Sequence, residues 1–471
     1  MKWRASSFFV AAMSGLCLMA VDAAATAKPL LLDEVLDSVD RQYPEILKAQ
    51  AEVDAQRGMR QASWSPFDPK LSVEWGQHRD GYPENEMLGA KLNAQVPGTG
   101  IVADFGWDHS VGSFPVYEGD RQTGRDGRWK GGLSLPLLRD LVIDNVRAKN
   151  EVEGLKLDEK EEAARVVKID TYMRAAVTFW EWSARIESQK IISDLLTLAE
   201  QREEILTKRV KRGDAPAVDL IDNQRIILQR RAQLLKAKQE SLNANLDLSV
   251  FLRDSSKEMI RPGGERAPRW LDPDAIKSTA GVDDVDKIVA QYPEIRKLQY
   301  ELKQLEVYRR LNGQSLLPRL DLLLEGARYE GELPSFRKDK NEFFVGLKFS
   351  LPLGNFGARG NDRAADMSYL AKRWELTLKE QRLKVDLAKI PAEVSTAKDI
   401  FMANFAEISA ADRMATAERK KFERGDSNLF LVNAREVDAA VTRMKAVTSL
   451  LDFYQKDLKL KLVQNNWIRR Y

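Results

Sequence analysis

The chain has 471 residues, 44% of them hydrophobic and 31% charged, and this length could form two or three ordinary domains. The formal net charge is only +3 with both signs interspersed, so the chain lacks the clustered basic charge expected of a nucleic-acid-binding protein. Its two histidines, His78 and His109, have no cysteine or carboxylate at ligand spacing, which argues against a metal site.

The N-terminus has the pattern of a secretory signal. Lys2 and Arg4 precede an apolar run over 8–21, and small residues follow at 23–27. The apolar run is too short to cross a membrane as a helix. We therefore expect a signal peptide over 1–27, cleaved after its last alanine or a few residues earlier. Cleavage would remove the only cysteine, so the mature chain would form no disulfides.

An internal duplication organises the rest of the chain. Residues 42–46 and 291–295 both read QYPEI, and residues 69–71 and 318–320, reading PKL and PRL, lie at the same offset of 249. Two further pairs extend the match, SLPL at 134–137 and 350–353 and RGD at 212–214 and 424–426. A second match at an unchanged offset is not expected by chance, so the sequence indicates two structural repeats.

We place the repeats at 28–253 and 283–471, with a linker over 254–282 that contains Pro262-Gly263-Gly264. Each repeat should begin with helix, over 31–63 in the first copy and 283–312 in the second. The proline of each QYPEI segment should start a new helix, because its missing N–H is no loss in the first turn.

After these helices the hydrophobic period changes to two. Leu71, Val73 and Trp75 alternate with polar residues, and 319–324, 342–351 and 129–135 alternate in a similar way. A soluble sheet with one buried face would give this pattern, and so would the strands of a membrane β-barrel. Because a secretory signal precedes them and very long helices follow, we favour the barrel.

The first repeat has an additional segment here. From Pro69 to Pro136 is 67 residues, whereas from Pro318 to Pro352 is 34, so the first copy has 33 more. Alternation over 90–96 and 101–107, around a turn at 97–100, predicts an extra β-hairpin. Residues 111–128 contain four glycines and several charges, so we expect an exposed loop.

Each repeat then ends in a very long helical hairpin. No proline occurs over 140–211, and apolar residues fall at helical spacing, so we expect a helix of about 108 Å at 1.5 Å per residue. After Gly213, a leucine-rich stripe at Ile221, Leu228, Leu235 and Leu242 has a spacing of seven, and the second repeat has a similar seam over 437–458. Such repeats are typical of coiled coils. Pro391 should kink the second long helix.

Each hairpin should turn at a glycine. Arg212-Gly213-Asp214 resembles an integrin-binding tripeptide, but it recurs as Arg424-Gly425-Asp426. We interpret both as the same turn, in which glycine tolerates a positive φ and aspartate caps the next helix.

These features together resemble the TolC-like family of outer-membrane efflux channels. The residues that carry the resemblance are Tyr43-Pro44-Glu45 and its copy, Leu135-Pro136-Leu137-Leu138-Arg139, and the glycine tips at 213 and 425. The resemblance implies a mixed fold, with long α-helical coiled-coil hairpins and a transmembrane β-barrel shared between three chains. It also implies a homotrimer in outer-membrane lipid, a tunnel through the periplasm, and tips that meet a periplasmic adaptor and an inner-membrane transporter.

The family pattern has two strands per repeat and twelve in the trimer. The extra hairpin would raise this to six strands per chain and eighteen in all if it entered the barrel wall. We expect it instead to stand above the membrane or to fold against the barrel.

Six tip residues are the candidate adaptor contacts: Arg212, Gly213, Asp214, Arg424, Gly425 and Asp426. Asp219 and Asp222, on one face of the returning helix, are candidates for a periplasmic gate that could select cations, although a solvated helix N-terminus would look the same. The family usually has its acidic pair in the second repeat, where this chain has Leu431 and Ala434. Asp219 matches the family's first-copy aspartate.

We find no phosphate-binding loop, nucleophile elbow or reactive cysteine, and so no catalytic residue and no cofactor. The sequence therefore predicts a passive exit duct of a tripartite efflux or type I secretion system, located in the outer membrane and extending into the periplasm. The alternative is a structural coiled-coil envelope protein of the periplasm.

Overall fold

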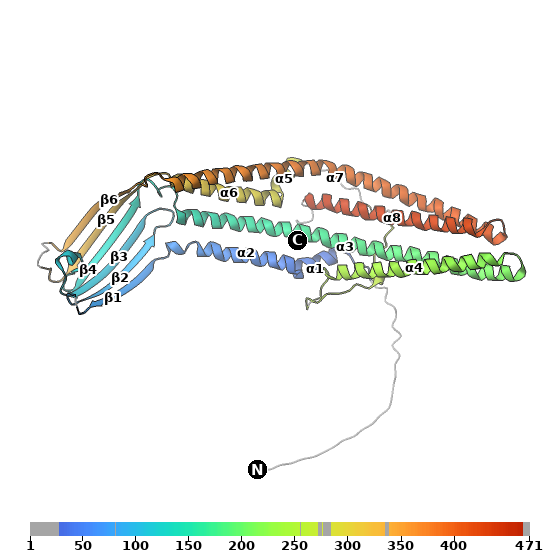
Figure 1. Cartoon of the computed structure of the whole chain (residues 1–471), viewed down its shortest axis with the longest axis horizontal. Coiled ribbons are helices and arrows are strands. Elements are labelled where there is room, and N and C mark those ends of the chain that lie inside the picture. The colour runs from blue at the N-terminus through green and yellow to red at the C-terminus, as the bar shows by residue number, and fades with distance from the viewer. Residues whose placement is uncertain are drawn as a thin grey trace, which may run out of the picture.

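The computed structural model describes residues 28–80, 82–254, 256–271, 276, 284–334 and 339–464. The signal peptide predicted over 1–27 lies outside this part. The described chain is elongated, with a sheet at one end and two helical tips at the other (Figure 1). None of its helices combines the length and the apolar character that crossing a membrane requires.

Each copy of QYPEI lies where one helix ends and the next begins. The first pair comprises α1 (Leu32–Gln42) and α2 (Pro44–Ala62), and the second comprises α5 (Val285–Gln291) and α6 (Pro293–Gln314). Both prolines occupy the first helical turn, as the sequence predicts. A short 3₁₀ turn, η1 (Ser65–Phe67), leads from α2 into the sheet.

The long helices form two hairpins. In the first repeat α3 (Asn145–Arg212) is followed by α4 (Ala217–Ser249), and in the second α7 (Phe356–Arg424) is followed by α8 (Leu429–Val463). Asp144 caps α3, since its Oδ1 accepts hydrogen bonds from two backbone N–H groups, at 2.8 and 2.9 Å. Helix α7 continues without a break through Pro391.

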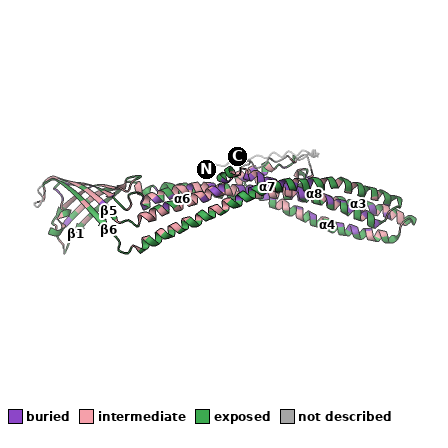
Figure 2. Cartoon of the chain, turned by 90° about the horizontal axis from the view of Figure 1, so that it is seen from above, coloured by how far each residue is buried: buried purple, intermediate pink, exposed green. Residues whose placement is uncertain are grey.

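The main apolar core lies at mid-length, where helices of both repeats meet (Figure 2). Trp182 of α3 is completely buried, and Trp180 stacks on Tyr454 of α8 with centroids 5.2 Å apart. The linker contributes Trp270, whose indole Nε1 donates to the carbonyl of Val447 at 3.2 Å. Nearby lies a 3₁₀ turn, η3 (Gly264–Arg266). The linker therefore packs against the helices that it connects.

The sheet has six strands in sequence order, and every neighbouring pair is antiparallel. The strands are β1 (Lys70–His78), β2 (Asn85–Gln95), β3 (Val102–Gly112), β4 (Gly127–Pro136), β5 (Arg319–Glu330) and β6 (Asn341–Ser350). The expectation for the extra hairpin is wrong, because β2 and β3 lie in the middle of the sheet. Their apolar residues are in phase with those of the strands beside them, so Leu92 pairs with Leu71, and Ala103 with Leu133.

The two faces of the sheet differ in chemistry. One face carries apolar side chains that are 42% to 74% exposed, which are Leu71, Val73, Trp75, Leu92, Phe105, Leu133, Phe343, Val345, Leu347 and Phe349. By the strand register, the other face carries charged side chains, among them Lys91, Asp104, Asp108, Arg128, Lys130, Glu325, Glu342 and Lys348. The first and last strands, β1 and β6, each have a strand neighbour on one side only within the described chain.

The segment between β3 and β4 is not simply an exposed loop. It contains a 3₁₀ turn, η2 (Val116–Arg121), and folds back over the polar face, so that Thr123 is only 7% exposed whereas Val116 is 99% exposed.

The stripe of α4, four apolar residues at a spacing of seven, is not the seam of the hairpin. Ile221, Leu228, Leu235 and Leu242 are 55% to 67% exposed, while α4 packs against α3 through a different face that includes Ile226 and Ile227.

Candidate functional site

The two hairpin tips have the same backbone structure. Gly213 and Gly425 have φ values of 82° and 91°, and each ends its long helix in the left-handed region. The N–H of Asp214 donates to the carbonyl of Arg209, and the N–H of Asp426 donates to that of Lys421, at 2.9 Å in both. Each tip is therefore a Schellman motif, which satisfies the last helical carbonyls.

The prediction that the tip aspartates cap the returning helices is wrong. Helix α4 follows Pro216 with no side-chain cap, and α8 is capped by Asn428, whose Oδ1 accepts from the N–H of Leu431 at 2.9 Å. The carboxylate of Asp214 instead lies 3.4 Å from the Nε of Arg212, in an exposed ion pair. The aspartate backbone belongs to the turn, and its side chain remains available at the surface.

Arg209 connects the two tips. Its Nη1 donates to the carbonyl of Phe422 at 2.9 Å, and its guanidinium lies over the Phe422 ring, 5.3 Å from the centroid. Beneath it, a small apolar cluster combines side chains of both hairpins, namely Leu206, Phe422, Leu429 and Val432. The six predicted tip residues thus lie at one end of the molecule, on two adjacent turns (Figure 1).

The candidate gate residues lie in the first turns of α4. Asp219 and Asp222 are both partly exposed, and the carboxylate of Asp222 pairs with the Nε of Arg225 at 2.9 Å. No second acidic pair joins them from α8, since the matching positions there are Leu431 and Ala434. The single chain therefore contributes one candidate acidic pair, Asp219 and Asp222, near its tip.

The sequence analysis missed a buried charged cluster between the hairpins. Glu436 of α8 is 2% exposed and accepts from Arg202 of α3, from Arg230 of α4 at 3.3 Å, and from Arg419 of α7 at 3.4 Å. Arg230 also donates to the amide oxygen of Asn433 at 2.6 Å. One carboxylate thus links all four long helices.

Burial lowers the pKa of the Arg202 and Arg230 guanidinium groups, and the Glu436 carboxylate opposes this shift. Both remain charged, because an arginine does not lose its proton in proteins. Charged residues on long helices usually occupy solvated faces, so the sequence offered little indication of this buried cluster. The one signal is that Arg230 falls on the same helical stripe as the buried Ile226.

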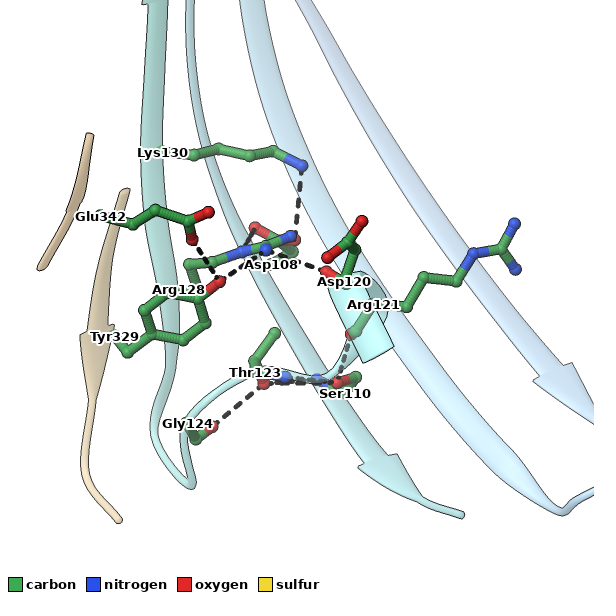
Figure 3. A network of polar contacts seen from close by, with 10 residues as sticks. All are labelled: Asp108, Ser110, Asp120, Arg121, Thr123, Gly124, Arg128, Lys130, Tyr329 and Glu342. Carbon is green, nitrogen blue, oxygen red and sulfur yellow. Dashed lines mark hydrogen bonds and ion pairs between the residues drawn. The ribbon is translucent and has the colours of Figure 1, made fainter. Parts of the chain in front are cut away.

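A second polar network lies on the charged face of the sheet (Figure 3). Arg128 of β4 pairs with Asp108 of β3 and donates to the hydroxyl of Tyr329 of β5 at 3.0 Å. That hydroxyl donates to the carboxylate of Glu342 on β6 at 3.0 Å, and Lys130 lies 3.3 Å from Asp108. The network crosses four strands, and the segment after β3 lies against it.

Residues 285–462 match the sequence model of the family described as outer membrane efflux protein. A search among curated protein sequences found no match. Over residues 285–462 the chain therefore resembles the outer membrane efflux proteins. This region spans α5 to α8 with β5 and β6, and the matched family is one of efflux proteins rather than of enzymes.

Solved structures show that the fold extends beyond the matched region. The outer membrane protein VceC of Vibrio cholerae is 13% identical, with 92% of this chain and 95% of that chain covered and a TM-score of 0.63. The MtrE outer membrane channel of Neisseria gonorrhoeae is 14% identical, with coverage of 92% and 88% and a TM-score of 0.64. The CmeC outer membrane channel of Campylobacter jejuni is 13% identical, with coverage of 92% and 85% and a TM-score of 0.62. The chain therefore has the fold of these channels along most of its length.

Proposed function

We propose that three copies of this chain close their sheets into one barrel in the outer membrane, and that the resulting channel is the exit duct of a tripartite efflux or type I secretion system. The unpaired edges of β1 and β6 support this proposal, because exposed strand edges favour pairing with another chain. With six alternating strands, β6 of one copy is antiparallel to β1 of the next. Three copies would then give eighteen strands.

The faces of the sheet support the same arrangement. The exposed apolar face would contact lipid, and the charged face would line a water-filled passage, as in other membrane barrels. A soluble sheet would instead cover its apolar face, because water does not favour a large exposed apolar surface. The exposed apolar face is the main observation that supports the proposal.

The helical end would continue the passage through the periplasm. We propose that a periplasmic adaptor contacts the tips at Arg212-Gly213-Asp214 and Arg424-Gly425-Asp426, and that an inner-membrane transporter supplies the energy. In a trimer, Asp219 and Asp222 would contribute six carboxylates near the periplasmic mouth, and a ring of this kind favours cations. We further propose that 28–253 and 283–471 are the two structural repeats, joined by 254–282.

The decisive experiment measures the mass of the full protein after it has been expressed with its signal peptide and extracted from membranes in detergent. Light scattering corrected for bound detergent should give three chains, and planar-bilayer recordings should then show channels. A monomer or dimer, or release by high salt without detergent, would contradict the proposal. That result would favour the structural coiled-coil protein of the periplasm.

A further inference from the structure

We propose that residues 113–126, here called the strap loop, form a size-selecting constriction at the outer mouth of the channel. The strap loop connects β3 to β4 at the end of the sheet remote from the helices (Figure 1). The inference rests on the proposed trimer, because only a closed barrel turns the charged face of the sheet into the wall of a pore.

The strap loop lies on the charged face and is attached to it through side chains. Arg128 donates through its Nη1 to the backbone carbonyl of Asp120 at 3.0 Å and to the hydroxyl of Tyr329, while its Nη2 pairs with Asp108 (Figure 3). Ser110 of β3 donates through its Oγ to the carbonyl of Arg121 at 2.8 Å. Arg128 is thus shared between the strap loop and the wall of the sheet.

A reciprocal pair of hydrogen bonds adds to this attachment. The N–H of Ser110 donates to Thr123 Oγ1 and the N–H of Thr123 donates to Ser110 Oγ, both at 3.0 Å. Asp120 extends over a hollow of about 460 Å³ whose other lining residues include Lys91, Asp104 and Glu325 of the charged face. These contacts place the strap loop over the face that would surround the pore.

Both ends of the strap loop are also bound through the backbone. The N–H of Ser113 donates to the carbonyl of Glu84 at 2.9 Å, and the N–H of Asp126 donates to that of Glu330 at 3.1 Å. Gly124 packs so closely that an added Cβ would lie 2.1 Å from the carbonyl oxygen of Glu330. The strap loop therefore has a defined position, while Val116 and Tyr117, 99% and 80% exposed, project from it.

The number of strands in the proposed barrel explains why the position of the strap loop matters for pore width. Barrel diameter grows roughly linearly with strand number, and barrels of about 16–18 strands leave an aqueous channel. The inserted β2 and β3 raise the trimer to eighteen strands, which widens the bore. Three strap loops on its inner wall would narrow that bore again at the outer rim, so they, and not the barrel, would set the largest solute that passes.

The test measures which graded poly(ethylene glycols) enter the reconstituted trimer, since exclusion of neutral polymers reports pore width without depending on charge. In one variant, Ser110→Cys and Thr123→Cys replace two side chains whose oxygens are 3.4 Å apart. The expected mature chain has no other cysteine. The oxidised variant should keep the wild-type size limit, and reduction should raise it because the hydrogen bonds of the Ser110 and Thr123 hydroxyls are lost.

A second variant combines Arg128→Met with Ser110→Ala and should admit larger polymers and show higher conductance. The matched control is Lys130→Met, which removes an ion pair to the same Asp108 but no bond to the strap loop, and it should keep the wild-type size limit. Channels that conduct but have one size limit in all these variants would overturn the inference. Failure of the wild-type protein to form channels would overturn the proposed function, and this inference with it.

Discussion

Arg230 of α4 and Glu436 of α8 form an ion pair 3.3 Å long, and their side chains are only 3% and 1% exposed. The pair joins the two repeats at a point where their association removes both charges from water. Glu436 is also the only carboxylate among the described contacts of Arg202. Glu436 is therefore the side chain that neutralises buried arginines of the first hairpin where the two hairpins meet.

Replacing that side chain should be strongly destabilising. Glu436→Gln leaves buried arginines without a carboxylate, and breaking a buried pair of this kind costs about 3–5 kcal/mol. We expect a lower thermal unfolding midpoint and faster proteolysis in the tip-side halves of the long helices. The control is Asp412→Asn, which breaks a pair with Arg443 that is 35% to 37% exposed, and should cost about 1 kcal/mol or less. Equal effects of the two changes would contradict the prediction.

Alanine at two glycine positions, one at a hairpin tip and one inside a helix, should change stability in opposite directions. Gly213→Ala forces a side chain into a left-handed conformation, at a cost of about 1–2 kcal/mol, and should speed hydrogen exchange in the last turn of α3. Gly58→Ala, inside α2 where an added Cβ meets nothing within 4 Å, should instead stabilise by about 0.5–1 kcal/mol. Unchanged exchange at the tip of Gly213→Ala would show that the turn carries no such constraint.

The exposed stripe of α4 should form contacts between copies of the chain in the proposed trimer. Leu228 and Leu235 are 64% and 67% exposed, so placing aspartates at both sites should leave the fold of one chain intact but prevent trimer formation. Light scattering should then give one chain with unchanged helical circular dichroism. Methionines at the same two positions, which keep the apolar surface, should preserve the trimer. A trimer in the doubly acidic variant would mean that the stripe contacts something else.

The stability of the helical body should fall in acid because of Glu153. Burial tends to raise the pKa of this carboxyl group, but hydrogen bonds from Lys156 and Gln56, at 2.8 and 2.6 Å, lower it overall. A lowered folded-state pKa stabilises the fold above the unfolded value of about 4.3, and this contribution is lost as pH falls through the folded-state pKa.

Glu153→Gln should therefore lower the unfolding midpoint at pH 7, and the difference from wild type should disappear in acid below that value. Glu161→Gln, which removes an exposed pair with Arg57, should change the midpoint little at any pH. A wild-type advantage that persisted at the lowest pH would contradict the assignment.

The proposed gate predicts how strongly multivalent cations block the channel. Neutralising Asp219 and Asp222 to asparagine should weaken block by trivalent cations added on the periplasmic side of the channel, because six carboxylates would be lost per trimer. Glu200→Gln, an exposed acid paired with Arg231 on the same hairpin, should leave the block unchanged. If the aspartate variant is blocked as strongly as wild type, these residues do not form the gate.

Much of this fold could be predicted from repeated residues and hydrophobic periods. Pro44 and Pro293 begin helices, and Gly213 and Gly425 end them, because these residues act through their own backbone. The position of β2 and β3 could not be predicted, since alternation fixes which face a residue takes but not which strand it joins. The stripe of α4 was predicted to be a coiled-coil seam, but Leu228 and Leu235 are exposed in the single chain, and Arg230, on another face of the same helix, is buried instead. A spacing of seven indicates an apolar face but not which element covers it.

The inserted β2–β3 hairpin also limits the ways in which the proposed channel could vary in width. A hairpin is the smallest addition that leaves the strands on either side of it antiparallel, and a protein that assembles in threes receives three of them at once. The bore would then change in increments of six strands and have no intermediate sizes. Fine adjustment of what passes would fall to the loops, which can lengthen or shorten by single residues without disturbing the register of any strand.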